Sequence, residues 1–149
     1  MALAATLIPK PKPARDYPNL NAILGIRGSF NVDPNAPGLG IVPGKYVLLG
    51  TIQARSSIIS AQLVVTTGGL AAGATYELLT ANDISTTVGP QSLLPATSLD
   101  AAGSFFPTGT EPALGYSNER RYVFGRLTSA APLTAGRWDA IVRYYTKFD

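Results

Sequence analysis

The last thirteen residues, 137–149, show the most regular alternation of hydrophobic and polar positions in the chain. One parity is apolar and the other is mostly polar: the first holds Trp138, Ala140, Val142, Tyr144 and Phe148, and the second holds Asp139, Arg143, Tyr145 and Lys147. Only Ile141 interrupts the polar side. A period of two over this length is typical of a strand with one face on a core. The pattern predicts a closing strand whose Trp138 and Val142 pack between two sheets.

Several earlier segments also predict strands, because β-branched and aromatic residues alternate in them with small or polar ones. They are residues 24–32, 74–80 and 119–128, with a shorter stretch at 84–88. Residues 89–117 are rich in Gly, Pro, Ser and Thr and are weakly patterned. A connection of this length is usually functional or contains short strands of its own.

Two stronger strand patterns follow residues 24–32. Residues 45–54 are apolar on both parities, which predicts a strand largely buried on both faces. Residues 57–67 have an apolar side, which we interpret as the core side, made of Ile59, Ala61, Leu63 and Val65. The link Arg55-Ser56 is short, so the two strands either pair as a hairpin or turn a corner between sheets.

The chain has no convincing helical period of 3.6 residues and no internal repeat. Seven or eight strands separated by turn residues predict an all-β fold, an antiparallel sandwich or a small barrel, and we expect the sandwich. Two packed sheets of jelly-roll type are the first choice, and an immunoglobulin-like sandwich is the second. We expect this domain to span residues 21–149, after an extended Pro-rich arm in residues 1–20.

The expected arm is basic as well as rich in proline. Each proline fixes φ and biases its predecessor toward extended conformations, so the arm is expected to be stiff. One interpretation is a solvated tail. The other is an arm that becomes ordered on a partner's surface. The candidate partner-binding residues are Leu7, Ile8, Lys10, Lys12 and Arg15.

The composition removes several kinds of chemistry. The 149 residues include neither cysteine nor histidine, so thiolate nucleophiles and disulfides are excluded, as are the commonest general base and transition-metal ligand. The net charge of +3 is too mild to indicate nucleic acid, and no apolar run approaches the roughly 18 residues of a membrane span. We expect a soluble chain made in a cytoplasm, with no cofactor, no metal and no small-molecule substrate.

Two near-matches to catalytic motifs fail. Residues 40–45 are one residue short of a phosphate-binding loop, and Pro43 removes an amide that the phosphates need. Gly115-Tyr116-Ser117 lacks the closing glycine of a nucleophile elbow. Paired carboxylates could still hydrolyse glycosides without histidine. The candidates, Glu77 with Asp83 and Glu111 with Glu119, are scattered, so we expect no catalytic residues and expect the acids to pair at the surface with Arg120, Arg121 and Arg126.

Arginine lies beside aromatic residues at 119–122 and at 137–138. Such interleaving occurs in nucleic-acid sites, but strand alternation alone produces it. Arginine and aromatic residues are also favoured at protein interfaces. We interpret both stretches as protein interface and expect no nucleic-acid partner.

The order of these features resembles the cement, or decoration, proteins of tailed-bacteriophage heads. The resemblance covers residues 45 to 149 and is carried by Tyr46-Val47-Leu48-Leu49-Gly50, residues 58–67, Tyr76-Glu77-Leu78-Leu79-Thr80 and residues 133–144. Such proteins combine an extended amino-terminal segment with a compact β domain, commonly a jelly roll, that sits on the capsid shell.

The resemblance implies a structural virion protein, made in the host cytoplasm, that binds the outside of a phage capsid shell. It would bridge subunits of the major capsid protein and form a homo-oligomer, a dimer or a trimer. The alternative is a carbohydrate- or host-receptor-binding module of a tail or head fibre. An exposed row of Trp138, Tyr144 and Tyr145 would favour that alternative.

Overall fold

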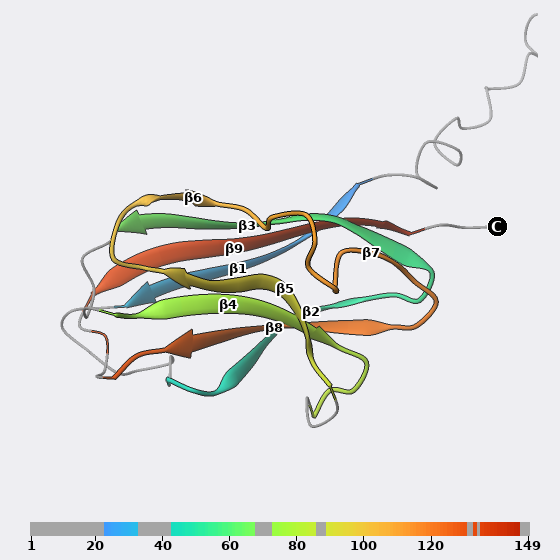
Figure 1. The fold of residues 1–149 in the computed structure, drawn as a ribbon, viewed down its shortest axis with the longest axis horizontal. Coiled ribbons are helices and arrows are strands. Elements are labelled where there is room, and N and C mark those ends of the chain that lie inside the picture. Colours follow the sequence, from blue (N-terminus) through green and yellow to red (C-terminus); the bar gives the residue numbers. More distant parts are fainter. Residues whose placement is uncertain are drawn as a thin grey trace, which may run out of the picture.

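The computed structural model of the 149-residue chain describes residues 23–32, 43–67, 73–85, 89–130, 133 and 135–146. Nine strands and no helix occur in these ranges, and accordingly no helix there could cross a membrane. In chain order the strands are β1 (Leu24–Val32), β2 (Tyr46–Ile52), β3 (Ser56–Thr67), β4 (Thr75–Ala81), β5 (Gln91–Ser98), β6 (Gly103–Phe105), β7 (Gly115–Ser117), β8 (Arg121–Thr128) and β9 (Gly136–Thr146) (Figure 1).

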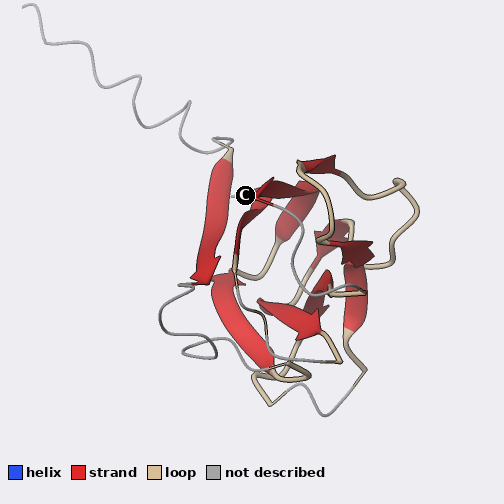
Figure 2. Ribbon diagram, turned by 90° about the vertical axis from the view of Figure 1, so that its left-hand side faces the viewer, coloured by secondary structure: helices blue, strands red, loops and turns tan. Residues whose placement is uncertain are grey.

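The strands form two antiparallel sheets that pack as a sandwich (Figure 2). The five-stranded sheet has the order β1-β9-β3-β6, with β7 also paired to β3, and the four-stranded sheet has the order β2-β8-β4-β5. The pairs are nested hairpins: β1 with β9, β2 with β8, β3 with β6 and β7, and β4 with β5. From the outermost hairpin to the innermost, successive hairpins belong alternately to one sheet and to the other, which is the jelly-roll topology. The predicted all-β jelly roll is confirmed, and the immunoglobulin-like alternative is not adopted.

An aromatic cluster joins the two sheets at the centre of the core. Trp138 on β9 is fully buried and stacks on Phe30 of β1, with ring centroids 5.5 Å apart. Tyr76 of β4 meets Trp138 from the opposite sheet at 5.6 Å. Gly125 leaves space for the Tyr76 side chain, because a Cβ at position 125 would lie 1.8 Å from the Tyr76 hydroxyl oxygen. Because Trp138 and Tyr76 are buried and Phe30 is partly buried against them, this cluster is a major contributor to the stability of the sandwich.

The predicted parity of the closing strand is confirmed. Trp138, Ala140 and Val142 have no exposed surface, and Tyr144 is half-buried against the core. Ile141 lies on the outer side, opposite Arg27 of β1. The last part of the predicted strand, residues 147–149, lies outside the described residues.

The prediction that residues 45–54 are buried on both faces is wrong. Tyr46 is 36% exposed and Leu48 is 44% exposed. A strand is buried on both faces only when a layer covers each side, and this sandwich has two layers. The link to β3 turns a corner between the sheets, where Arg55 has a positive φ of 65° and its amide donates to the Ser117 carbonyl at 2.9 Å.

The prediction for the core side of β3 is also wrong at one residue. Ala61, Leu63 and Val65 are buried as expected, but Ile59 is 46% exposed and Ile58 is buried in its place. The register against β9 shifts between Ile58 and Ser60. This β-bulge inserts one residue and thereby reverses the parity on one side of it.

The long connection at 89–117 contains three strands, and β5 is the longest of them. Its register against β4 shifts twice, its apolar residues Leu93 and Leu94 are adjacent in sequence, and Pro95 lies within it. These features removed the alternation by which a strand is recognised. The short strand expected at 84–88 is not formed at Ile84, which lies in a turn, and residues 86–88 lie outside the described residues.

Candidate interaction surfaces

The outer side of the four-stranded sheet carries three rows of side chains that run across β2, β8 and β4. The cross-strand register gives the rows Tyr46–Arg126–Glu77, Leu48–Phe124–Leu79 and Thr51–Tyr122–Ala81. The alternate residues of β8, among them Val123 and Leu127, point into the core. We call the nine residues of these rows the aromatic face.

Phe124 is the centre of the aromatic face. It is only 3% exposed, yet it does not belong to the core cluster between the sheets. Leu48 and Leu79 flank it across the strands, and the Tyr46 ring meets it edge-on with centroids 6.2 Å apart. The face therefore holds a second, smaller apolar cluster, with Tyr46 and Leu48 as its exposed rim.

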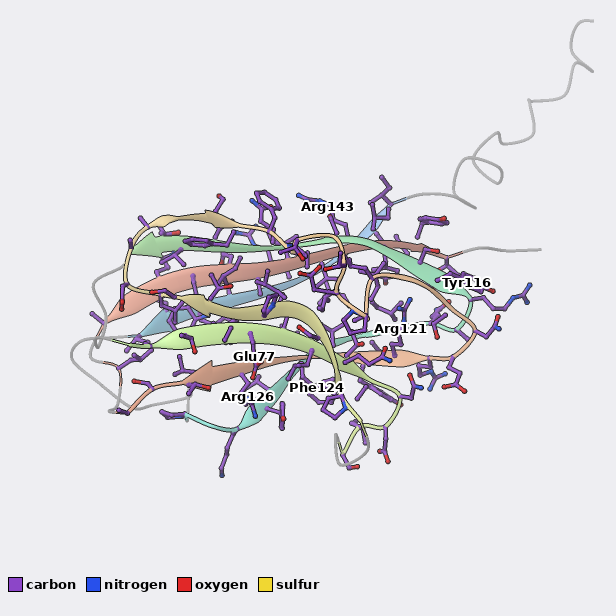
Figure 3. All side chains as sticks on the ribbon, viewed as in Figure 1. Glu77, Tyr116, Arg121, Phe124, Arg126 and Arg143 are labelled. Atoms are coloured by element: carbon purple, nitrogen blue, oxygen red, sulfur yellow. The ribbon has the colours of Figure 1, made fainter. Side chains whose placement is uncertain are left out.

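Arg126 orders one border of this cluster. Its guanidinium pairs with the Glu77 carboxylate, donates a hydrogen bond of 3.1 Å to the Tyr46 hydroxyl and lies 5.0 Å from the centroid of the Tyr46 ring. Figure 3 shows Phe124, Arg126 and Glu77 together along the lower side of the sandwich. Tyrosine and arginine held in this way resemble the residues that dominate protein interfaces.

The outer side of the five-stranded sheet is different. We call it the polar face; its residues are Arg27, Ser29, Asn31, Ser57, Ser60, Gln62, Val64, Arg137, Asp139, Ile141, Arg143 and Tyr145, and the exposed Ile59 and Tyr116 lie beside Ser57. Arg27 and Asp139 form an ion pair of 2.9 Å. Partial burial raises the pKa of Asp139. Hydrogen bonds from Ser29 and Arg27, together with the charges of Arg27 and Arg137, lower this pKa by a larger amount, so its net shift is downward.

The candidate partner-binding residues Leu7, Ile8, Lys10, Lys12 and Arg15 all lie outside the described residues. The boundary between the arm and the domain, expected at residues 20–21, lies there too. Both stay predictions.

The candidate acids are engaged separately. Glu77 is paired with Arg126 on the aromatic face. Glu111 is buried in the turn before β7, where it accepts hydrogen bonds from the Thr108 amide (2.7 Å), the Thr108 hydroxyl (2.8 Å) and the Gly109 amide (2.9 Å). Burial raises the pKa of Glu111, but these hydrogen bonds outweigh it and lower the pKa to about 2. Glu111 is thus an acceptor that shapes a turn.

Arg121 is not at the surface, as had been expected. It is only 5% exposed, and it donates to three backbone carbonyls: Ser56 at 2.7 Å, Ala113 at 3.1 Å and Gly115 at 3.2 Å. Burial lowers its pKa. Its inward position follows from the parity of β8, whose residues Val123 and Leu127 on the same side are core residues. Arg121 therefore ties the start of β3 to the turn before β7.

The aromatic row that would favour a carbohydrate platform is not formed. Trp138 is fully buried and Tyr144 points toward the core, which leaves Tyr145 alone on the outer side. The same alternation separates Arg137 from Trp138 and Arg121 from Tyr122. The basic–aromatic stretches are thus not continuous surfaces.

A small hollow lies where β4 ends. It has a volume of about 340 Å³ and is lined by Thr80, Ala81, Asn82, Asp83, Gly89 and Gln91. Its one charged group, the Asp83 carboxylate, accepts a hydrogen bond from the Ser85 amide at 2.9 Å. Throughout the described ranges no three potential metal ligands come together.

Sequence reasoning missed the aromatic face. The usable signal was that β8 and β2 are apolar on both parities. In a fold of only two layers, such a strand must turn one apolar side outward.

The described surface of this jelly roll therefore offers contact area without a cluster of reactive groups. No family model and no curated protein matches the chain. Two solved structures resemble it. A chain of the capsid of Ralstonia phage GP4 has a TM-score of 0.57 and 16% identity, over 100% of this chain and 96% of that one. A chain of the cyanophage Pam1 capsid asymmetric unit has a TM-score of 0.52 and 14% identity, over 95% of each chain. At these identities the likeness concerns the fold, and it confirms the fold that the resemblance to phage-head proteins implied.

Proposed function

We propose that this chain is a structural virion protein that binds the outside of a phage capsid shell and stabilises it by bridging capsid subunits. The observation that carries the proposal is the likeness in fold to chains of two phage capsids. Because nearly the whole of both chains is covered in each comparison, those capsid chains are close to this one in size. The likeness thus spans nearly the whole length of each chain compared.

A role without catalysis is supported by the way the acids are used. Glu77 and Glu111 each satisfy a separate structural contact, and the chain lacks histidine and cysteine. A cement protein needs a rigid domain and contact area, and does not need acid–base chemistry. It would be made in the host cytoplasm and act on the capsid surface.

The aromatic face is the part of the described surface whose composition suits contact with the major capsid protein. Its apolar centre is already ordered by Leu48, Leu79 and Tyr46, so little side-chain entropy would be lost on binding. The polar face has charged and hydroxyl groups, and removing them from water on binding would cost free energy. The arm, residues 1–20, would add a second attachment through Leu7 and Ile8, with a salt-sensitive part from Lys10, Lys12 and Arg15.

The test is co-sedimentation of the purified chain with undecorated heads assembled from the major capsid protein of the phage that encodes it. The full-length chain should co-sediment and should raise the temperature at which the heads open. Deletion of residues 1–20 should weaken attachment greatly and leave the melting temperature of the chain within a few degrees. Absence of binding by the full-length chain at low salt would overturn the proposal.

Two matched variants separate the faces. Leu48→Asp places a charge on the exposed rim of the aromatic face and should reduce binding to heads by about tenfold or more. Gln62→Asp makes the same change on the polar face and should leave binding within about twofold. Equal loss from both variants would show that the aromatic face is not the attachment surface.

A further inference from the structure

The four lateral edges of the two sheets are not alike. A free strand edge presents unpaired backbone groups, and proteins usually protect such edges with short strands, prolines or bulges. The β5 edge contains Pro95 and two register shifts, and β2 shifts between Leu48 and Gly50. The edge formed by β6 and β7 consists of two separate strands of three residues each.

The β1 edge has none of these protections. β1 pairs with β9 through nine consecutive residues, from Leu24 to Val32, without a register shift. It contains no proline and no lysine. Among the described residues its only sheet neighbour is β9, so its other side has no strand partner there. In Figure 2 β1 stands upright at the left rim of the sandwich.

The sequence of β1 is compatible with pairing to itself. Its core-side residues are Ile26, Gly28, Phe30 and Val32, opposite Val142, Ala140, Trp138 and Gly136 of β9. In an antiparallel pair centred on Gly28, Ile26 lies opposite Phe30 of the second copy and Gly28 lies opposite Gly28. Apolar residues then meet apolar residues on the core side, and all nine residues of each strand are paired. Cross-strand pairs of this kind stabilise a sheet.

The charges select this register. Centring the pair one residue earlier would place Arg27 directly opposite Arg27, and like charges in that position are destabilising. With Gly28 at the centre, Arg27 lies opposite Ser29 of the second copy. Ser29 is the register partner of Asp139, which is the carboxylate that Arg27 binds in its own chain. Each Arg27 thus lies in the same cross-strand row as Asp139 of the other copy, with Ser29 of that copy between them.

We propose that β1 pairs antiparallel with β1 of a second copy of this chain, centred on Gly28, so that the two five-stranded sheets become one continuous sheet. This inference does not rest on attachment to a capsid. It leaves the aromatic face of each copy free, because that face belongs to the other sheet.

The test uses the absence of cysteine from the chain. Arg27→Cys and Ser29→Cys are prepared separately, mixed and treated with a mild oxidant. Opposite residues of an antiparallel pair have Cβ atoms about 4.5–5.5 Å apart, close to what a disulfide requires. The mixture should give a disulfide-linked dimer. Each variant alone should link much more slowly, because the diagonal separation is about 7–8 Å.

A pair of controls and a second measurement complete the design. A mixture of Ser60→Cys and Gln62→Cys, on the polar face but away from the edge, should not link. Sedimentation equilibrium of the unmodified chain should show a dimer, and Ser29→Lys should weaken it by about tenfold, because the amine would lie opposite Arg27 of the second copy. In the single chain that amine would lie beside Asp139, so the melting temperature should not fall.

Rapid linking of Ser29→Cys alone, in which Arg27 is retained, would overturn the proposed register. A monomer in sedimentation together with no linking in the mixture would overturn the self-pairing altogether. Protection of either cysteine from alkylation when the variant is bound to heads, without a dimer in solution, would assign the β1 edge to a contact with the capsid instead. Binding of the unmodified chain to heads is scored separately, so failure here and failure of the capsid role are distinguishable.

Discussion

Phe124 and Ile141 occupy equivalent places on the two sides of the molecule. Each is an apolar residue that points outward from an internal strand of its sheet, β8 or β9. Phe124 lies between Leu48 and Leu79 and is almost fully buried, whereas Ile141 lies between Arg27 and Gln62 on a polar surface. Whether an outward apolar residue forms a cluster therefore depends on its neighbours across the strands, which are distant in sequence.

The difference also gives the two faces different chemical character. The aromatic face has an ordered apolar centre with an exposed rim, which suits contact with another protein. The polar face keeps its ion pair and hydroxyl groups in water. Under the proposed function, the aromatic face would serve for attachment while the polar face would stay in water.

The largest expected effect comes from the core that both faces share. Trp138→Ala should cost about 3–5 kcal/mol, because it removes a fully buried ring that contacts both sheets. Chemical denaturation monitored by far-ultraviolet circular dichroism measures the change. A loss below about 0.5 kcal/mol would mean that the sheets are not held together by this cluster.

The difference between the aromatic face and the polar face is tested by truncating Phe124 and Ile141. Phe124→Ala should cost about 2–3 kcal/mol, less than a core ring because the cavity opens to solvent, and Ile141→Ala about 0.5–1 kcal/mol. The same denaturation experiment applies. Equal costs would remove the distinction between the faces.

The two ion pairs provide a finer comparison. Arg126→Ala should cost about 1 kcal/mol, because Arg126 also binds the Tyr46 ring and hydroxyl. Arg27→Ala should cost less than about 0.5 kcal/mol, since the Arg27 side chain is 65% exposed. Thermal melts at low and high salt would measure both, and a larger loss for Arg27→Ala would contradict the ranking.

The smallest effect concerns the carboxylate of the polar face. Because the pKa of Asp139 is lowered in the folded state, its ionised form stabilises the fold at neutral pH, and this contribution is lost as the pH falls below about 4. Asp139→Asn should therefore be slightly less stable than the unmodified chain at pH 7 and equally stable at the acid end. Glu111→Gln provides a reference, because the pKa of Glu111 is lowered from 4.5 to about 2 and its contribution to stability is lost as the pH falls between these values. A stability gap for Asp139→Asn that widened toward acid would contradict the assignment.

The sequence predicted the strands whose two parities differ in polarity. In β9, Arg137, Asp139 and Arg143 mark the outer side, so Trp138 and Val142 were placed correctly. In β8 both parities are apolar or aromatic, and the pattern could not tell that Phe124 points outward.

Three local features lay beyond any periodic pattern. The inward position of Arg121 depends on three backbone carbonyls that only the folded chain brings together. A single bulge moved Ile59 outward, and β5 lost its alternation to Pro95 and two register shifts. Which apolar residues cluster outside the core likewise depends on strand pairing, so the pattern of β2 and β8 indicates an outward apolar side but not which residues form it.

The nested hairpins have a consequence for the order in which the molecule can form. β9 is the strand to which both β1 and β3 pair, and it is the last strand along the described chain. While the chain is being synthesised, β1 has no strand to pair with until β9 has been made. The two strands are far apart in sequence: Arg27 of β1 and Asp139 of β9 are separated by 112 positions. The five-stranded sheet therefore cannot close on the ribosome until residue 146 has emerged, and pairings this distant in sequence are slow to form. A pause in translation before β9 would leave the regular edge of β1 exposed on both sides.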